Sequence, residues 1–164
     1  MRSSIRLFGV ALILWPLLSS NAFALSCMPP TPENVFNLHR ERITEYVMAV
    51  GKVTPAGSLR KFNWRTLKHE PLGRFRATFD GYAARRSGFD LPLTLPVTVE
   101  RSCFNGVCGM LPVAFPAVVF LRKEESRYLL QTEYCNSTLL PNPTGEDLAS
   151  LIRCLNGGGC SAPN

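Results

Sequence analysis

The sequence predicts a mainly β protein, consistent with a small barrel, that ends in one helix and is stabilised by disulfides. Three observations lead to this fold class. Several segments alternate apolar and polar residues with the period of two that is typical of a half-buried strand. Residues 146–155 instead place apolar residues at helical spacing. Six cysteines follow a leader of the export type.

The composition is that of a folded chain. Of the 164 residues, 46% are hydrophobic and 18% are charged, which argues against disorder. No apolar run after the leader approaches the roughly 20 residues of a spanning helix, so we expect no transmembrane span in the mature chain. The 18 basic and 12 acidic residues give a net charge of +6, and loss of Arg2 and Arg6 would leave 16 basic residues and a charge of +4.

Residues 1–24 have the features of a signal peptide. Arg2 and Arg6 form a basic start, and residues 7–18 are apolar except for one glycine and one proline. The tripeptide Ala22-Phe23-Ala24 then supplies the small residues that signal peptidase accepts. We therefore expect cleavage after Ala24.

Cleavage at that point leaves residues 25–164 as a single domain in the periplasm or outside the cell. Two variants stay open. Cleavage after Ser26 would make Cys27 the first residue, and a lipoprotein would be anchored through the same cysteine. N-terminal sequencing of the mature protein distinguishes these cases.

The first part of the mature chain predicts a helix followed by strands. Residues 33–42 suit a short helix anchored by Phe36. Residues 43–53 are rich in β-branched and other apolar side chains, which favours a strand, and residues 54–57 would end it. A further strand, rich in exposed basic residues, is expected over residues 59–67.

Two alternating segments follow. Residues 74–82 place Phe75, Ala77 and Phe79 on one face. In residues 91–101, Pro92 and Pro96 lie on the outward face, and because proline cannot donate a ladder hydrogen bond, the first half should be a sheet edge or precede the sheet. The inward face of that segment is expected to carry Leu91, Leu93, Leu95, Val97 and Val99.

The last third predicts a hairpin and a helix. Residues 117–121 and 127–134 read as two antiparallel strands joined by a polar turn. Thr144 is expected to cap the helix over residues 146–155, with Asp147 three residues later in a capping-box arrangement.

The cysteines indicate structural disulfides. An even number in an exported chain is typical of a disulfide framework, although six cysteines allow 15 pairings. Zinc binding and redox chemistry are less favoured because no Cys-x-x-Cys spacing occurs and neither histidine lies near a cysteine. A tight Asn-Gly turn and a glycine-rich loop favour two short bridges and leave a third long one: Cys103–Cys108, Cys154–Cys160 and Cys27–Cys135.

Short motifs in a shared order resemble the netrin-like module, the OB-like barrel of the tissue inhibitors of metalloproteases. The resemblance covers about half of the mature chain, and residues 55–96 match little of the family pattern. It implies a disulfide-stabilised OB-like barrel with a C-terminal helix. The matching positions are Cys27-Met28-Pro29, Phe36, Val47, Val50, Gly51, Val53, Val107-Cys108-Gly109, residues 117–121, Tyr128, Cys135 and the helix that contains Cys154.

The resemblance also implies an inhibitory route. Inhibitors of this family insert the free amine of an N-terminal cysteine into a protease's catalytic zinc site. Cys27 resembles the second of the family's two leading cysteines, and cleavage after Ala24 would make Leu25 the first residue. The zinc-binding amine would then be missing, and it returns only when the leader is cut before Cys27.

No catalytic set is visible. The two histidines, His39 and His69, both lie in charged runs that are typical of an exposed surface. No nucleophile elbow, zinc-protease motif or phosphate-binding glycine loop occurs. We therefore expect no enzyme, no metal site and no cofactor, while an enzyme of unrecognised type remains the alternative that mutation of either histidine would test.

The richest candidate for function is a basic and aromatic stretch. Basic residues beside exposed aromatic rings bind anionic glycans, lipid headgroups or an acidic protein surface. Export makes nucleic acid an unsuitable partner. In the competing interpretation, the aromatic rings are core residues and the charges only solvate a strand. The predicted partner-binding residues are Arg60, Lys61, Phe62, Trp64, Arg65, Arg74 and Arg76.

Three functions follow from these observations. The first is an exported, non-catalytic module that binds an unknown exported protein or an anionic glycan or lipid surface through the basic stretch. The second, which depends on the resemblance, is an inhibitor or accessory factor of an exported enzyme. The third is an unrecognised periplasmic enzyme.

Overall fold

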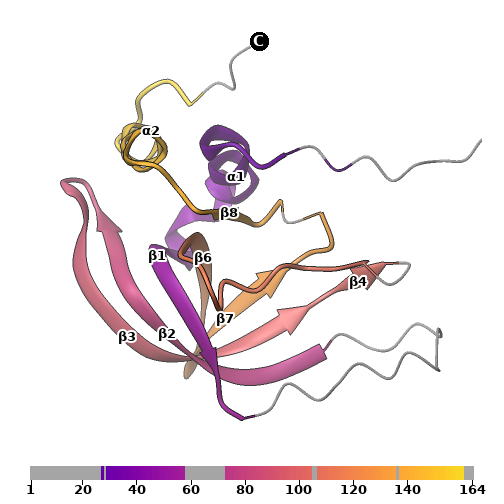
Figure 1. The fold of residues 1–164 in the computed structure, drawn as a ribbon. Helices are drawn as coiled ribbons and strands as arrows, with labels where there is room; N and C mark the ends of the chain where they lie inside the picture. Colours follow the sequence, from indigo (N-terminus) through magenta and orange to yellow (C-terminus); the bar gives the residue numbers. More distant parts are fainter. Residues whose placement is uncertain (1–26, 28, 58–72, 105–106, 136, 161–164) are drawn as a thin grey trace, which may run out of the picture.

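The computed structural model describes residues 27, 29–57, 73–104, 107–135 and 137–160. Figure 1 shows the order of their helices and strands along the chain. The elements are α1 (Pro32–His39), the 3-10 helix η1 (Arg40–Glu45), β1 (Tyr46–Pro55), β2 (Gly73–Arg85), β3 (Gly88–Arg101), β4 (Cys103–Phe104), β5 (Val107–Cys108), β6 (Ala117–Glu124), β7 (Arg127–Thr132), β8 (Leu139–Pro141) and α2 (Gly145–Leu155).

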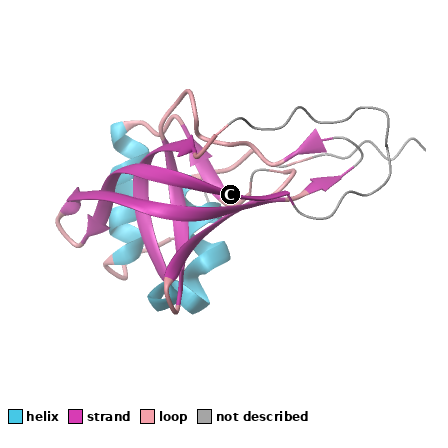
Figure 2. Ribbon diagram, turned by 90° about the horizontal axis from the view of Figure 1, so that it is seen from below, coloured by secondary structure: helices cyan, strands magenta, loops and turns pink. Residues whose placement is uncertain are grey.

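The strands close into a barrel. Within the described residues, five strands follow the order β1-β2-β3-β7-β6, and β6 pairs back with β1. Neighbouring strands are antiparallel except for β3 and β7, which run parallel. A three-stranded meander closed by a hairpin is an OB-like arrangement, and Figure 2 shows the strands wrapping around one another. The predicted OB-like barrel with a C-terminal helix is confirmed.

Alternation along the strands builds the barrel core. Ala77 and Phe79 of β2 are buried, and Phe75 packs against them, as the sequence predicts. Val97 and Val99 of β3 are buried on the same inner side. Because successive side chains point to opposite faces, the residues between them remain on the outer surface of the barrel.

The predicted edge in β3 is also confirmed. Apart from Asp90 at a β-bulge, all of β3 is paired with β2, but β7 pairs only with residues 97–101 on its other side. Residues 88–96 therefore form an edge within the described sheet, and this edge contains Pro92 and Pro96. A proline suits such an edge because its missing N–H breaks no hydrogen bond of the ladder.

Two details differ from the sequence prediction. Leu91 was expected to point inward, yet it is 42% exposed because it pairs with Ala83 beside a β-bulge, where the β2–β3 hairpin extends beyond the closed barrel. The first strand begins at Tyr46 and not at residue 43, since residues 40–45 form η1. Ile43 packs instead against the core beneath the helices.

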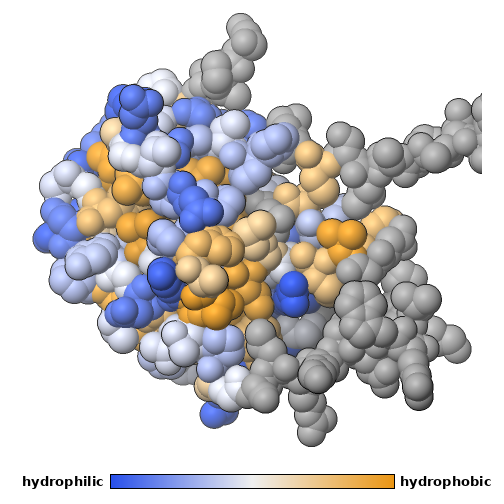
Figure 3. Space-filling model, in the orientation of Figure 1, coloured by the Kyte–Doolittle hydropathy of each residue, from blue (hydrophilic) through white to orange (hydrophobic). Residues whose placement is uncertain are grey.

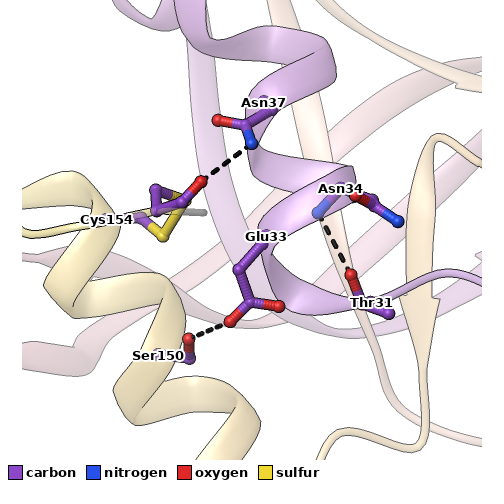
Figure 4. The surroundings of a disulfide bond; sticks show 7 residues. Thr31, Glu33, Asn34, Asn37, Ser150 and Cys154 are labelled. Atoms are coloured by element: carbon purple, nitrogen blue, oxygen red, sulfur yellow. Dashed lines mark hydrogen bonds between the residues drawn. A yellow bond between two sulfur atoms is a disulfide. The ribbon is translucent and has the colours of Figure 1, made fainter. Parts of the chain in front are cut away.

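Helices α1 and α2 cover one side of the barrel (Figure 1). The Ser150 hydroxyl donates a 2.6 Å hydrogen bond to the Glu33 carboxylate, and the Asn37 amide donates to the Cys160 carbonyl at 2.9 Å (Figure 4). The predicted capping box at the start of α2 is present. The helices and the strands beneath them form a second core of Val35, Phe36, Met48, Val118, Phe120, Leu140, Leu151 and Cys154.

All six cysteines are paired. The three disulfides are those that the local geometry of the sequence favours: Cys27–Cys135, Cys103–Cys108 and Cys154–Cys160. Two of them close short loops, while Cys27–Cys135 spans 108 residues and fixes the start of the described chain beside the end of β7. The fold is therefore stabilised covalently both beside α2 and at the β4–β5 hairpin.

Candidate functional site

The structure places two of the predicted partner-binding residues. Arg74 and Arg76 lie near the start of β2, where it pairs with the end of β3, and both side chains are on the outer surface. The other five, which are Arg60, Lys61, Phe62, Trp64 and Arg65, lie outside the described residues. They belong to residues 58–72, the connection between β1 and β2.

The outer face of β2 is polar along most of its length. Every second residue points outward, and this row ends in Tyr82, which is 51% exposed. The Thr94 hydroxyl of β3 donates a 2.7 Å hydrogen bond to Asp80 in the same row. The row consists of Arg74, Arg76, Thr78, Asp80 and Tyr82.

The two arginines of this row have different surroundings. The Arg74 guanidinium contacts the Glu100 carboxylate at 2.6 Å, and the Gln131 amide donates to the same carboxylate at 3.3 Å. Arg76 faces Thr98 across the ladder and forms no ion pair with any described residue. Arg76 therefore leaves its charge unneutralised by the described part of the chain, whereas the charge of Arg74 is largely matched.

The two-stranded hairpin β4–β5 projects beyond the barrel where β3 ends. Its register pairs Cys103 with Cys108 and Phe104 with Val107, and the first pair is also a disulfide. We call this end, where β2 begins and β3 ends, the hairpin end of the barrel. Figures 1 and 2 show the hairpin projecting from it in both views.

Three hydrogen bonds attach the base of this hairpin to the barrel. The Arg101 Nε donates to the Gly109 carbonyl at 2.6 Å, and the Gly109 amide donates to the Ser102 carbonyl at 2.9 Å. The Ser102 amide in turn donates to the Thr132 carbonyl of β7 at 2.9 Å. Burial lowers the pKa of Arg101, but a guanidinium stays protonated at neutral pH.

Gly109 lies against the backbone of β7. A Cβ atom at this position would stand 2.6 Å from the carbonyl carbon and oxygen of Thr132. Only glycine permits so close an approach between two backbones. Sequence reasoning noted Gly109 as part of a short motif but missed this contact, because Thr132 lies in a distant strand.

The hairpin carries apolar side chains on its surface. Phe104 is 40% exposed and Val107 is 52% exposed. The Phe104 ring contacts the ring of Tyr134, with 5.4 Å between the ring centroids. Sequence reasoning used this stretch only for its turn, although apolar residues on either side of Asn-Gly were the available signal.

Asp80 and Asp90, two acids in the part of the chain that is described, are both engaged by neighbouring side chains. No group of three or more His, Cys, Asp and Glu side chains is placed to hold a metal ion there. Asp80 is bound by Thr94, while Asp90 is held by Arg85 and Ser87 at the other end of the β2–β3 hairpin.

The expectation that His39 is exposed is wrong. It is 8% exposed because α1 lays its ring flat on Phe120, with centroids 4.1 Å apart, and edge-on to Tyr46. Its Nδ1 lies 2.9 Å from the Val35 carbonyl, which fits an N–H donor there. His69 lies outside the described residues.

No protein-family model, curated protein or solved structure matches this chain. None of the described helices is long and apolar enough to cross a membrane.

Proposed function

We propose that this chain is an exported, non-catalytic binding module that engages an anionic surface through the start of β2 and the connection before it. The observation that carries the proposal is Arg76, an exposed cation on the outer face of the barrel without an acidic partner among the described residues. Such a charge is available to a partner at little cost in desolvation.

The distribution of charge supports the same surface. Residues 58–72 hold one acid, Glu70, and four cations, which are Arg60, Lys61, Arg65 and Lys68. The connection leads directly into β2, so in sequence this excess of base adjoins Arg74 and Arg76. A concentrated positive charge attracts anionic partners and speeds their association.

The architecture supports it by analogy. OB barrels bind their ligands on the outer face of their second and third strands and on the loop between the first two strands. Here those elements are β2, β3 and residues 58–72. Fold alone does not determine function, so the argument depends on the charges that occupy this face. Three disulfides favour the oxidising compartment that the proposed leader would reach.

A sulfated-glycan column tests the proposal with heparin as the anionic probe. We expect Arg76→Glu to elute at lower salt than the wild type, and combined reversal of Arg60, Lys61 and Arg65 to lower it further, because each reversal replaces attraction by repulsion. Arg86→Glu is the matched control, since Arg86 is exposed on the far tip of the β2–β3 hairpin. Equal shifts for Arg76→Glu and Arg86→Glu would mean that only net charge matters, and the proposal would fail.

A further inference from the structure

The three disulfides differ in how accessible their cysteines are. Cys154 is 5% exposed and belongs to the second core, and Cys160 packs against that core. In each of the other two bridges, one cysteine is exposed, Cys27 or Cys103, and its partner is half-buried. A thiolate must reach a sulfur atom in order to exchange with it, so access favours reaction at these two bridges.

The Cys103–Cys108 pair is held by more than its sulfur atoms. The two cysteines face each other across the β4–β5 ladder, and the Gly109 amide donates to the Ser102 carbonyl directly behind them. The Ser102 amide is bound in turn to the Thr132 carbonyl of β7. After reduction, these bonds would keep the two thiols opposite each other, and such a high effective concentration favours the closed disulfide.

The Cys154–Cys160 pair is held in a similar way. The Asn37 amide donates to the Cys160 carbonyl at 2.9 Å (Figure 4), and the Gly158 amide donates to the Arg153 carbonyl at 2.8 Å. The turn between the two cysteines is therefore fixed to both α1 and α2, and its thiols would also stay together after reduction.

Cys27 has a weaker hold. It belongs to no helix or strand, and Cys135 lies in a turn after β7. Apart from the bridge, no hydrogen bond joins Cys27 to a described residue. The chain is next anchored at Thr31, the N-cap of α1, four residues further on. In Figures 1 and 3 the described chain ahead of α1 lies at the rim of the molecule.

Reduction would therefore leave Cys27 on a short tether. Its thiol would spend part of its time away from Cys135, so the effective concentration of this pair would fall below that of the other two pairs. An exposed bond of this kind has a more oxidising potential, which is the property of labile and regulatory disulfides. The barrel does not depend on it for closure, because the ladder between β1 and β6 joins its ends.

We propose that Cys27–Cys135 is a redox-sensitive switch, which a protein dithiol opens while the other two bridges stay closed. A thiolate of the dithiol attacks the exposed Cys27 Sγ, the bond to Cys135 Sγ breaks, and Cys135 leaves as a thiolate that takes up a proton. The second thiol of the dithiol loses its proton and attacks the mixed disulfide, which releases Cys27. Two electrons and two protons thus pass to the pair, and the dithiol becomes a disulfide.

The switch goes beyond the proposed function, because neither cysteine belongs to β2 or to the connection before it. It also differs from the redox chemistry of a Cys-x-x-Cys pair, which the sequence disfavours, since these two cysteines are 108 residues apart. The oxidised form fixes the chain ahead of α1 beside the end of β7, and the reduced form releases it.

Graded reduction of the full, oxidised protein tests the switch, with dithiothreitol as the dithiol. Free thiols are trapped with N-ethylmaleimide at low pH and assigned by peptide mass mapping. We expect Cys27–Cys135 to be half-reduced at a ratio of reduced to oxidised dithiothreitol at least tenfold lower than the other two bridges, which corresponds to a potential about 30 mV higher. Half-reduction of either other bridge within tenfold of this ratio, or below it, would overturn the switch.

Hydrogen exchange read by mass spectrometry locates the change. At the ratio that opens only this bond, exchange should rise in peptides from the chain ahead of α1 and stay unchanged in β1, β2 and β3. A rise throughout the barrel would mean that the bond supports the fold, and the absence of any rise ahead of α1 would mean that Cys27 stays in place. Either result would overturn the switch.

The Cys103→Ser/Cys108→Ser variant is the matched control. It removes the other bridge that has an exposed cysteine, and the hairpin that this bridge closes does not hold Cys27. We expect the folded variant to open Cys27–Cys135 at the wild-type ratio. A shift of tenfold or more would show that the two bridges act together, and the assignment of the switch to Cys27–Cys135 alone would fail.

Discussion

The ring of His39 titrates inside the core beneath the helices. Burial lowers its pKa below the ordinary value of 6.5, and the Val35 carbonyl and the charge of Glu133 offset this only in part. The unfolded chain therefore takes up a proton near pH 6.5, while the folded protein resists it until lower pH. The free energy of unfolding should fall as the pH drops below 6.5, and level off once the folded ring is protonated.

The pH prediction has a direct measurement. Urea unfolding between pH 7 and pH 5 should show the wild type losing at most about 1.4 kcal/mol per pH unit from this ring. His39→Phe keeps a flat ring against Phe120 and removes the titration, so its stability should depend less steeply on pH over that range. Equal slopes for the two proteins would contradict the argument.

Gly109 yields a second prediction at this scale. Gly109→Ala would press a Cβ atom onto the backbone of Thr132, which no rotamer change relieves. We expect a loss of about 1–3 kcal/mol in the free energy of unfolding, as for other overpacked sites. Gly73→Ala is the control, because a Cβ atom there would meet nothing within 4 Å. Chemical denaturation of both variants measures the difference, and equal stability would refute the close approach.

At the scale of elements, the prolines of β3 protect an edge. Pro92 and Pro96 are paired with β2 without donating to it, so their nitrogens face the unpaired side of the strand. These two positions on the edge therefore have no N–H group with which another chain could pair. This is a known way to prevent sheet edges from pairing between molecules.

Replacement of both prolines should expose that edge. Pro92→Thr/Pro96→Thr restores two donors in a β-favouring residue, and we expect more self-association at high protein concentration, visible by analytical ultracentrifugation. Pro143→Thr, at a half-buried position in the loop before α2 and outside the sheet, serves as the control. A double variant that stays as monomeric as the wild type would show that the edge is protected by other means.

The elements that the sequence predicts best are those governed by local rules. Alternation fixed the inner face of β2 and the end of β3, and the cap of α2 needed only Thr144 and Asp147. His39 was misplaced because the charges beside it hide a ring whose neighbours, such as Phe120, come from distant strands. For the candidate site, the sequence identified Arg74 and Arg76 but not the ion pair between Arg74 and Glu100. Such partners are set by strand register, which local pattern does not reveal.

At the scale of the whole molecule, the two sides of the barrel differ in kind. One side is covered by α1 and α2 and is rich in internal hydrogen bonds. The outer face of β2 instead presents the exposed guanidinium of Arg76 to the outside. The residues that stabilise the fold and those proposed to bind a partner are therefore largely separate. Substitution of Arg76 should change binding with little effect on stability, as is usual for exposed side chains.

The long bridge from Cys27 to Cys135 has a consequence for biogenesis. A polypeptide that crosses a membrane from its N-terminus delivers Cys27 first, and the next thiol to emerge is Cys103. Joining cysteines in order of arrival would couple these two and leave the native partner of each unavailable. An exported chain would thus need either to assemble the barrel before its cysteines are oxidised, or to have an isomerase exchange the early bond.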